Sequence, residues 1–347
     1  MTDLKNNELI ISSAALLESN TDDDQEGVDS FVEATGIELR HGSVPIEGHG
    51  QRLDVALGVL VPEFSRSYLQ QLIAAGAVQL NGVPLSKSAA RVKAGQSLAI
   101  ELRPTLQSQA FKPEAMSIDV VFEDEFLLII NKPAGLVVHP APGNWSGTLL
   151  NGLLARDPQS AFLPRAGIVH RLDKDTSGLM VVARHRPTMD QLVEMIAART
   201  VSRNYLALAH NAWQGVKTKH LDFPVGRDPK NRLRMAVVDL KKNTGKTAAT
   251  DNTLLESTPH YCFVQCKLHT GRTHQVRVHM AALGHPLVAD ELYGGKPSLG
   301  MQRQALHAFR LGFKHPVHHT AIQYETALPE DMAAALLDLG LRYNTSS

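Results

Sequence analysis

The stretch Pro164–Arg184 reads PRAGIVHRLDKDTSGLMVVAR, and it is more informative about fold and function than any other part of the chain. Its centre, from His170 to Asp173, is too polar for a protein core. A turn of small residues at 176–178 follows, and then a buried-looking strand at 179–183. A carboxylate flanked by cations, on a turn that enters a strand, is how a fold presents a reactive group from a rigid support. On local sequence alone, a solvated surface loop is the alternative.

The bulk composition predicts a cytoplasmic protein of at least two domains. The chain has 347 residues, and no run reaches the roughly 18–20 apolar residues that a membrane span requires. The N-terminal apolar patch at 10–17 is short and interrupted, which argues against a signal peptide. Cys262 and Cys266 are four residues apart in a strand-like segment, so they should lie about 13 Å apart. That separation is too large for a disulfide and suits a reducing compartment.

The formal net charge of zero conceals a segregation of charge along the chain. Residues 1–50 hold eleven acidic and two basic side chains, so the remainder, with 33 basic and 24 acidic, carries a net charge of +9. A basic body suggests a polyanionic partner such as RNA, although a basic protein without such a partner would look the same. We expect the acidic leader, residues 1–48, to be disordered. It would act either as a solubilising tail or as an autoinhibitory mimic of RNA.

Residues 51–102 predict a small α+β unit. Two short amphipathic helices, the second capped by Ser65, precede a hairpin at Asn81-Gly82 and a strand at 97–102. The pattern resembles the RNA-binding domain named after ribosomal small-subunit protein four. This resemblance implies that basic residues scattered along the unit contact RNA, and the candidates are Arg52, Arg66 and Lys87.

A polar, proline-marked linker at 103–117 leads to a larger domain at 118–345. Strand-like segments are expected at 118–122, 126–130, 201–209, 247–255, 261–268 and 303–313. Helices are expected at 148–155, 187–198, 271–283 and 332–341. The elements are mixed without a regular βαβ alternation, which indicates an α+β fold.

Two further segments carry candidate functional residues. Residues 269–279 hold two arginines and three histidines around Gly271, and a helix there would let Arg277 offer its guanidinium to a carboxylate or phosphate. A solvated basic helix face is the alternative. Tyr205 stands inside an apolar strand, where a tyrosine is usually a packing residue.

We expect neither a metal nor an organic cofactor. The segment around Gly245-Lys246 lacks the first glycine of a phosphate-binding loop. His315, His318 and His319 suggest a metal site, but we expect no cysteine or carboxylate to complete it, so they are interpreted as a surface loop.

The segment Ala166–Leu179 resembles the signature of the RluA/RluD family of pseudouridine synthases. Further marks of the family follow in its order, so the resemblance spans about residues 51–335, and it is strongest to the RluD branch. These marks are Asn131-Lys132-Pro133, Val138-His139-Pro140, Tyr205, Gly245-Lys246, Thr270–His279 and Arg303–Ala308.

The resemblance implies a mixed, mostly antiparallel sheet with a central cleft and three catalytic residues. Asp173 would be the reacting carboxylate, since the family's aspartate follows His-Arg-Leu, which sets Asp175 aside. Arg277 would pair with it, and Tyr205 would stack on the target base and take part in removing the C5 proton. Arg171 would fill the space that the base vacates. Further RNA contacts are expected from Lys132, His170, Arg272 and His274.

The implied substrate is the helix 69 stem-loop of large-subunit ribosomal RNA, as free 23S RNA or in a pre-50S particle, acted on by a monomer. The same chemistry on another structured RNA is an alternative. A non-catalytic RNA-binding assembly factor would lack a catalytic residue, and none is missing. A nucleoside hydrolase would need a second carboxylate, for which no motif is found.

Overall fold

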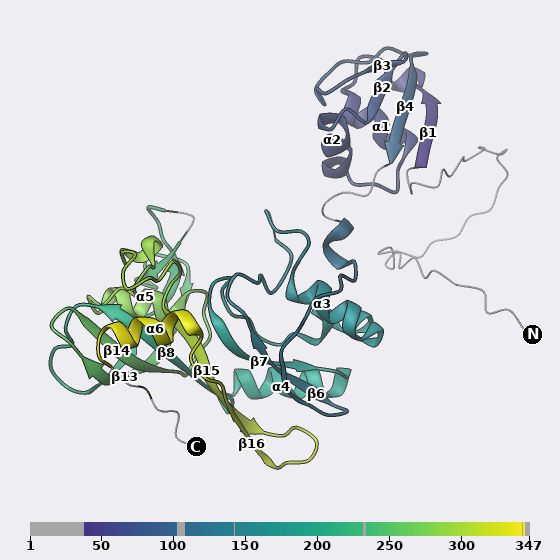
Figure 1. Cartoon of the computed structure of the whole chain (residues 1–347). Coiled ribbons are helices and arrows are strands. Elements are labelled where there is room, and N and C mark those ends of the chain that lie inside the picture. Colours follow the sequence, from purple (N-terminus) through teal and green to yellow (C-terminus); the bar gives the residue numbers. More distant parts are fainter. Residues whose placement is uncertain (1–37, 103–107, 142, 232–233, 342, 344–347) are drawn as a thin grey trace, which may run out of the picture. The chain divides into compact units, whose positions relative to one another are not determined.

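The computed structural model describes residues 38–102, 108–141, 143–231, 234–341 and 343, and the chain divides into two compact units after Thr105 (Figure 1). The greater part of the predicted acidic leader, residues 1–37, lies outside the described residues. Among the residues described, no helix combines the length and the apolar character needed to cross a bilayer.

The first unit packs two helices against a four-stranded sheet. Helices α1 (Leu53–Leu60) and α2 (Arg66–Ala74) precede strands β2 (Val78–Leu80), β3 (Val83–Pro84) and β4 (Ser97–Leu102). The strand order is β1-β4-β2-β3. The predicted local signals are confirmed, because Ser65 Oγ accepts a hydrogen bond from Tyr68 N at 3.3 Å and Asn81 and Gly82 both have positive φ.

Strand β1 (Glu38–Ser43) corrects the expected boundary of the leader. It pairs antiparallel with β4 over six residues, so the sheet begins ten residues before the expected end of the disordered segment. The strand was missed because backbone pairing holds it, while its side chains alternate between half-buried and exposed. Gly42 allows the strand to approach α1, since a Cβ there would lie 2.4 Å from Leu60 Cδ1.

The second unit is built on a nine-stranded sheet with the order β5-β6-β7-β15-β8-β14-β13-β9, and β16 pairs with β15 (Figure 1). Its strands are β5 (Val120–Glu123), β6 (Leu127–Lys132), β7 (Ser177–Ala183), β8 (Ser202–His210), β9 (Thr218–Asp222), β13 (Ala249–Ser257), β14 (Tyr261–Leu268), β15 (Leu306–Lys314) and β16 (Ala321–Glu325). Strands β10 (Val225–Arg227), β11 (Met235–Val237) and β12 (Gly245–Lys246) form a separate small sheet. Neighbouring strands of the large sheet are antiparallel except β7 and β15.

Helices cover both faces of the large sheet. Residues of α3 (Leu149–Arg156) and α5 (Gln275–Ala282) share one apolar cluster with Tyr205 and Ala207 of β8. The alternate residues of β8, Leu206 and Leu208, pack on the opposite face with α6 (Glu330–Asp338). Helix α4 (Arg186–Ala197) covers that same opposite face beside β6 and β7. Tyr205 therefore belongs to the face that carries α3 and α5.

The seam between β7 and β15 brings the two halves of the sheet into close backbone contact. Gly178 has φ +118°, and a Cβ there would lie 2.3 Å from Ala308 O. Only glycine therefore fits at this position. The turn that carries Asp173 leads directly into β7, so the pairing of β7 with β15 also fixes the C-terminal end of that turn.

The predicted helices and strands of this unit are present, with two kinds of difference. The helix expected from residue 271 begins at Gln275, because His274 adopts a left-handed conformation (φ +56°) at its N-cap. Strands β9–β12 and β16 were not predicted. They are short or polar, and they run along sheet edges or in the small separate sheet. Cys262 and Cys266 are buried free thiols.

Candidate active site

A turn held by hydrogen bonds at several points presents Asp173. The ring Nε2 of His170 accepts from the backbone N–H of Val181 in β7 at 3.0 Å. Thr176 N donates to Asp173 O at 3.1 Å. The side chain of Asp173 is 15 % exposed, so its carboxylate is sheltered but reachable.

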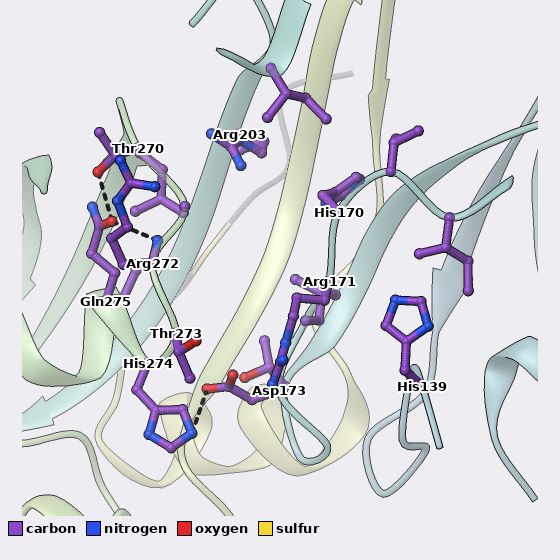
Figure 2. A pocket seen from close by; sticks show the side chains of 18 of the residues that line it. His139, His170, Arg171, Asp173, Arg203, Thr270, Arg272, Thr273, His274 and Gln275 are labelled. Carbon is purple, nitrogen blue, oxygen red and sulfur yellow. Dashed lines mark hydrogen bonds and ion pairs between the residues drawn. The ribbon is translucent and has the colours of Figure 1, made fainter. Parts of the chain in front are cut away.

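His170 was expected to contact RNA, and in the structure its ring is hydrogen-bonded within the fold. Burial, with Arg203 adding to it, lowers the pKa of His170 to about 3. The imidazole is therefore neutral, and its Nε2 is already occupied as a hydrogen-bond acceptor. It therefore lines the cavity as a neutral ring and not as a cation (Figure 2).

Lys132 was also expected to contact RNA, but its side chain is fully buried. Its Nζ donates to the carbonyl oxygens of Pro133, Leu136 and Lys174, at 2.8 to 2.9 Å. Burial lowers the pKa of Lys132 to about 8, while Asp175 and Asp173 oppose that shift. Because all three ammonium protons are used inside the fold, Lys132 ties the loop after β6 to the turn that carries Asp173.

Arg277 of α5 joins Asp173 to a second carboxylate that the sequence did not indicate. Its Nη1 lies 3.1 Å from Asp173 Oδ2, while Nε and Nη2 each donate at 2.8 Å to the two oxygens of Asp290. The pKa of Arg277 is raised well above its usual value by these carboxylates, despite burial. Asp290 thus fixes the plane of the guanidinium, so that its free edge faces Asp173.

His274 stands beside this pair. Its Nε2 lies 3.9 Å from Asp173 Oδ2. A dashed line marks this contact in Figure 2. Its Nδ1 lies 2.9 Å from the hydroxyl of Tyr293. Burial lowers the pKa of His274, against the opposing effect of Asp173. Tyr293 was not predicted from the sequence, and its ring also lies against the Arg277 guanidinium at 5.0 Å.

Tyr205, in the middle of β8, lines the same cavity as Asp173 and Arg277. It is 6 % exposed, and burial raises the pKa of its phenol to about 12, so the phenol is neutral near pH 7. The three residues expected to be catalytic therefore meet in one cavity, although they come from a turn, a strand and a helix.

This cavity has a volume of about 780 Å³ and an unusual charge distribution. Among its described lining residues, Asp173 is the single acid. The aromatic side chains of Phe111 and Trp145 also line it, and Phe111 is 68 % exposed. Six arginines also line it: Arg165, Arg171, Arg199, Arg203, Arg272 and Arg277. The excess of cations suits an anionic substrate, to which the cavity presents a single carboxylate.

The other residues expected to contact RNA fall in two places. Arg171 is exposed next to Asp173 (Figure 2). Arg272 lines the same cavity, and its Nε donates to Thr247 O at 3.1 Å. In the first unit, Arg52 and Arg66 both bind the buried carboxylate of Asp54, yet their side chains remain 37 % and 56 % exposed.

Lys87, the third candidate of the first unit, is exposed. Asp54 is also bound by Gln70, and its pKa is held far below the usual range, chiefly by Arg52. Arg52 and Arg66 thus stabilise this unit while keeping part of their surface available.

Two histidine–carboxylate clusters do not include Asp173, Tyr205 or Arg277. The expectation that no carboxylate joins His315 was wrong, because its Nε2 lies 2.9 Å from Asp124 and the ring is buried. Its Nδ1 accepts from the backbone N–H of Val317 and His318, so both ring nitrogens are engaged. In the second cluster, His220 and His269 bind the two oxygens of Asp251.

Comparison with known proteins finds matches to both units. A family model described as RNA pseudouridylate synthase matches residues 126–282, and a model of the S4 domain matches residues 51–98. A protein of Neisseria meningitidis serogroup B named "Ribosomal large subunit pseudouridine synthase D" is 45 % identical over 345 residues, covering 95 % of this chain and 89 % of that protein. A protein of the same name from Xylella fastidiosa is 45 % identical over 313 residues, covering 86 % and 92 %.

Among solved structures, Human RNA Pseudouridylate Synthase Domain Containing 1 matches with a TM-score of 0.51 and 26 % identity. The match covers 65 % of this chain and 90 % of that chain. The fold of the second unit is therefore shared with proteins of this kind.

Proposed function

Because the chain belongs to the RNA pseudouridylate synthase family and carries an S4 domain, we propose that it modifies uridines in the helix 69 stem-loop of large-subunit ribosomal RNA. At the coarser level, the chain is an RNA pseudouridine synthase that acts on large-subunit ribosomal RNA. The choice of helix 69 rests on the resemblance to the RluD branch, which the run through Lys174-Asp175 and the N-terminal RNA-binding unit carry. We further propose a monomer that works in the cytoplasm, on free 23S RNA or on a pre-50S particle.

The observation that carries the proposed mechanism is the isolation of one carboxylate among cations. Asp173 is the single acid of the described cavity wall, and Arg277 lies 3.1 Å from its Oδ2. A neighbouring guanidinium favours the ionised form of a carboxylate and orients its lone pairs. Asp173 is therefore assigned as the group that attacks the nucleoside or stabilises its oxocarbenium-like centre.

The reaction is an isomerisation and balances without a second substrate. The N1–C1′ bond of uridine breaks, the uracil turns, and a C5–C1′ bond forms. The hydrogen lost from C5 is matched by the one gained at N1. One carboxylate suffices because no group leaves the nucleoside, whereas hydrolysis by paired carboxylates needs two such groups.

Tyr205 and Arg171 are assigned to handling the extruded base. A uridine must leave its stack before Asp173 can reach it, and the neutral phenol of Tyr205 offers a flat, buried wall with one polar atom. Arg171 is exposed at the mouth beside Asp173, where its guanidinium can occupy the space left in the RNA stem. Phe111 and Trp145 offer faces for stacking unpaired loop bases.

The direct test is pseudouridine mapping of ribosomal and transfer RNA from cells with and without this protein. We expect signals in helix 69 to disappear in the deletion strain and to return with the wild-type chain. Restoration by an Asp173→Asn chain would contradict the assigned chemistry. If pseudouridine disappears only from a transfer RNA site, the assigned chemistry stands and the proposed helix 69 target is wrong.

Incubation of purified protein with a synthetic helix 69 stem-loop and with assembled particles then separates the two substrate forms. Modification of particles alone would indicate that the assembling subunit supplies part of the recognition. Binding without modification of either would favour an assembly factor, and release of free uracil would favour a hydrolase.

A further inference from the structure

Arg203 is a buried cation that the catalytic scheme above does not use. It is 6 % exposed and lies on β8, two residues before Tyr205, so both side chains project from the same face of the strand. It lines the catalytic cavity, on the wall near Arg272 (Figure 2). Its Nε is buried and has no hydrogen-bond partner within the described parts of the chain.

The charges around Arg203 do not compensate it. Burial lowers its pKa, Arg272 acts in the same direction, and the opposing influence comes from the Tyr205 phenol. The buried guanidinium of Arg277 differs, since it binds both Asp290 and Asp173. Asp173, the single acid of the described cavity wall, is thus already engaged by another arginine.

A buried charge without a counter-ion costs folding free energy, and native proteins rarely tolerate one without a reason. An ordered water would satisfy the free N–H but would leave the charge uncompensated. Gly271 makes room for this guanidinium, because a Cβ there would lie 2.6 Å from its Nη1. The cavity wall therefore keeps an unneutralised cation in place before substrate arrives.

We propose that Arg203 binds a phosphodiester group of the RNA next to the extruded uridine. This inference rests on the proposed function, because it is the RNA substrate that brings the anion into the cavity. The planar guanidinium fork matches two non-bridging phosphate oxygens. An extruded nucleotide stays joined to both of its phosphates, so one enters the cavity with it. Arg203 would thereby set the depth at which the uridine stops beside Tyr205 and Asp173.

The test is a double-mutant cycle between Arg203 and single phosphates of a synthetic substrate stem-loop. Wild-type protein and Arg203→Met are compared on RNA in which one phosphate at a time is replaced by a neutral methylphosphonate. At the contacted phosphate, we expect the replacement to weaken wild-type binding by roughly 10- to 150-fold. The same replacement should have almost no further effect on Arg203→Met.

Two further readouts separate binding from structure. Arg203→Met should reduce the slope of log affinity against log salt by about 0.7, the value for one phosphate contact to a single strand. It should also raise the melting temperature of the free protein, because an uncompensated buried charge is removed. Arg203→Lys should keep the salt slope but lose part of the affinity.

Arg310→Met is the matched control. Arg310 is on the neighbouring strand β15, pairs with Glu325 at 2.5 Å and does not line the cavity. Its loss should lower the melting temperature and leave RNA affinity unchanged.

The proposal fails if wild type modifies the RNA and each methylphosphonate replacement weakens binding of Arg203→Met by the same factor as it weakens binding of wild type. It also fails if Arg203→Met melts at a lower temperature and binds RNA like wild type, since Arg203 would then be structural. If wild type neither binds nor modifies RNA, the proposed function fails instead.

Discussion

Arg277 reaches Asp173 with one edge of its guanidinium and Asp290 with the other. The contact to Asp173 is a single hydrogen bond of 3.1 Å, whereas the contact to Asp290 is bidentate at 2.8 Å. The buried Asp290 thus holds the guanidinium with two hydrogen bonds, whereas the more accessible Asp173 accepts only one. The hydrogen bonds to Asp290 therefore fix the orientation of the guanidinium toward Asp173.

Asp173→Asn should abolish pseudouridine formation while RNA binding stays near wild type. The amide keeps the shape and can still accept from Arg277, but it is a poor nucleophile and carries no charge. We expect a fall in the single-turnover rate of about 10³-fold or more. Asp175→Asn, two residues away, is the control and should retain activity. Equal losses in both variants would mean that the wrong aspartate has been assigned.

Asp290→Asn should lower kcat by about 10²-fold with little change in KM, because a displaced Arg277 misplaces Asp173 without removing an RNA contact. The measurement is steady-state kinetics on the stem-loop substrate. In an Arg277→Lys background, the same substitution should add little, since Asp290 acts through that arginine. Independent, multiplicative losses would show that Asp290 has a separate role.

Phe111→Ala should weaken RNA binding by roughly 5- to 150-fold, the range for losing one base–aromatic stack. Asn151 Nδ2 donates to the carbonyls of Ala110 and Lys112, so the backbone on both sides of this exposed ring is held in place. Phe162→Ala is the matched control, because Phe162 is 77 % exposed but does not line the cavity. Equal affinity of the two variants would remove Phe111 from the interface.

Stability of the second unit should fall as the pH drops below about 6.5, and His170 should contribute to the fall. The pKa of His170 is about 3 in the folded chain, below its ordinary value of 6.5, so the unfolded chain binds the extra proton between these pH values. The slope from this group is at most about 1.4 kcal/mol per pH unit. The contribution is complete above pH 6.5 and absent below pH 3.

Denaturant unfolding at pH 7.5, 6.0 and 5.0 measures this effect. His170→Gln should flatten the dependence on pH, whereas replacement of the exposed His260 by Gln should not. Parallel curves for wild type and His170→Gln would show that the ring is not held neutral.

Removal of residues 1–105 should weaken affinity for the stem-loop more than it alters the rate on saturating RNA. The cut follows the division between the two units and removes strand β1 with its sheet. A shorter deletion that began at residue 51 would leave β1 without β4. Unchanged affinity would argue against an RNA-binding role for the S4 domain.

Local signals in the sequence predicted most elements, since their causes lie within a few residues. The Asn81-Gly82 turn, the Ser65 cap and the apolar run of β7 are of this kind. Strand β1 could not be predicted in the same way, because it depends on pairing with a strand that follows more than fifty residues later.

The same distinction between local signals and contacts across the fold applies to the site. The motif around Asp173 was informative, and Tyr205 and Arg277 followed from the family resemblance. The burial of Lys132, the neutrality of His170 and the partnership of Asp290 with Arg277 depend on contacts across the fold. A basic residue in a sequence does not reveal whether its charge meets solvent, carbonyl oxygens or a carboxylate.

The contact between Asp173 and Arg277 spans 104 residues of sequence, and Asp290 follows thirteen residues later. During synthesis, Asp173 leaves the ribosome long before Arg277 and Asp290. A nascent chain therefore cannot form this three-residue network until the residues through Asp290 have been made. Formation of the ion pair thus reports that the chain from Asp173 to Asp290 has been synthesised and has folded.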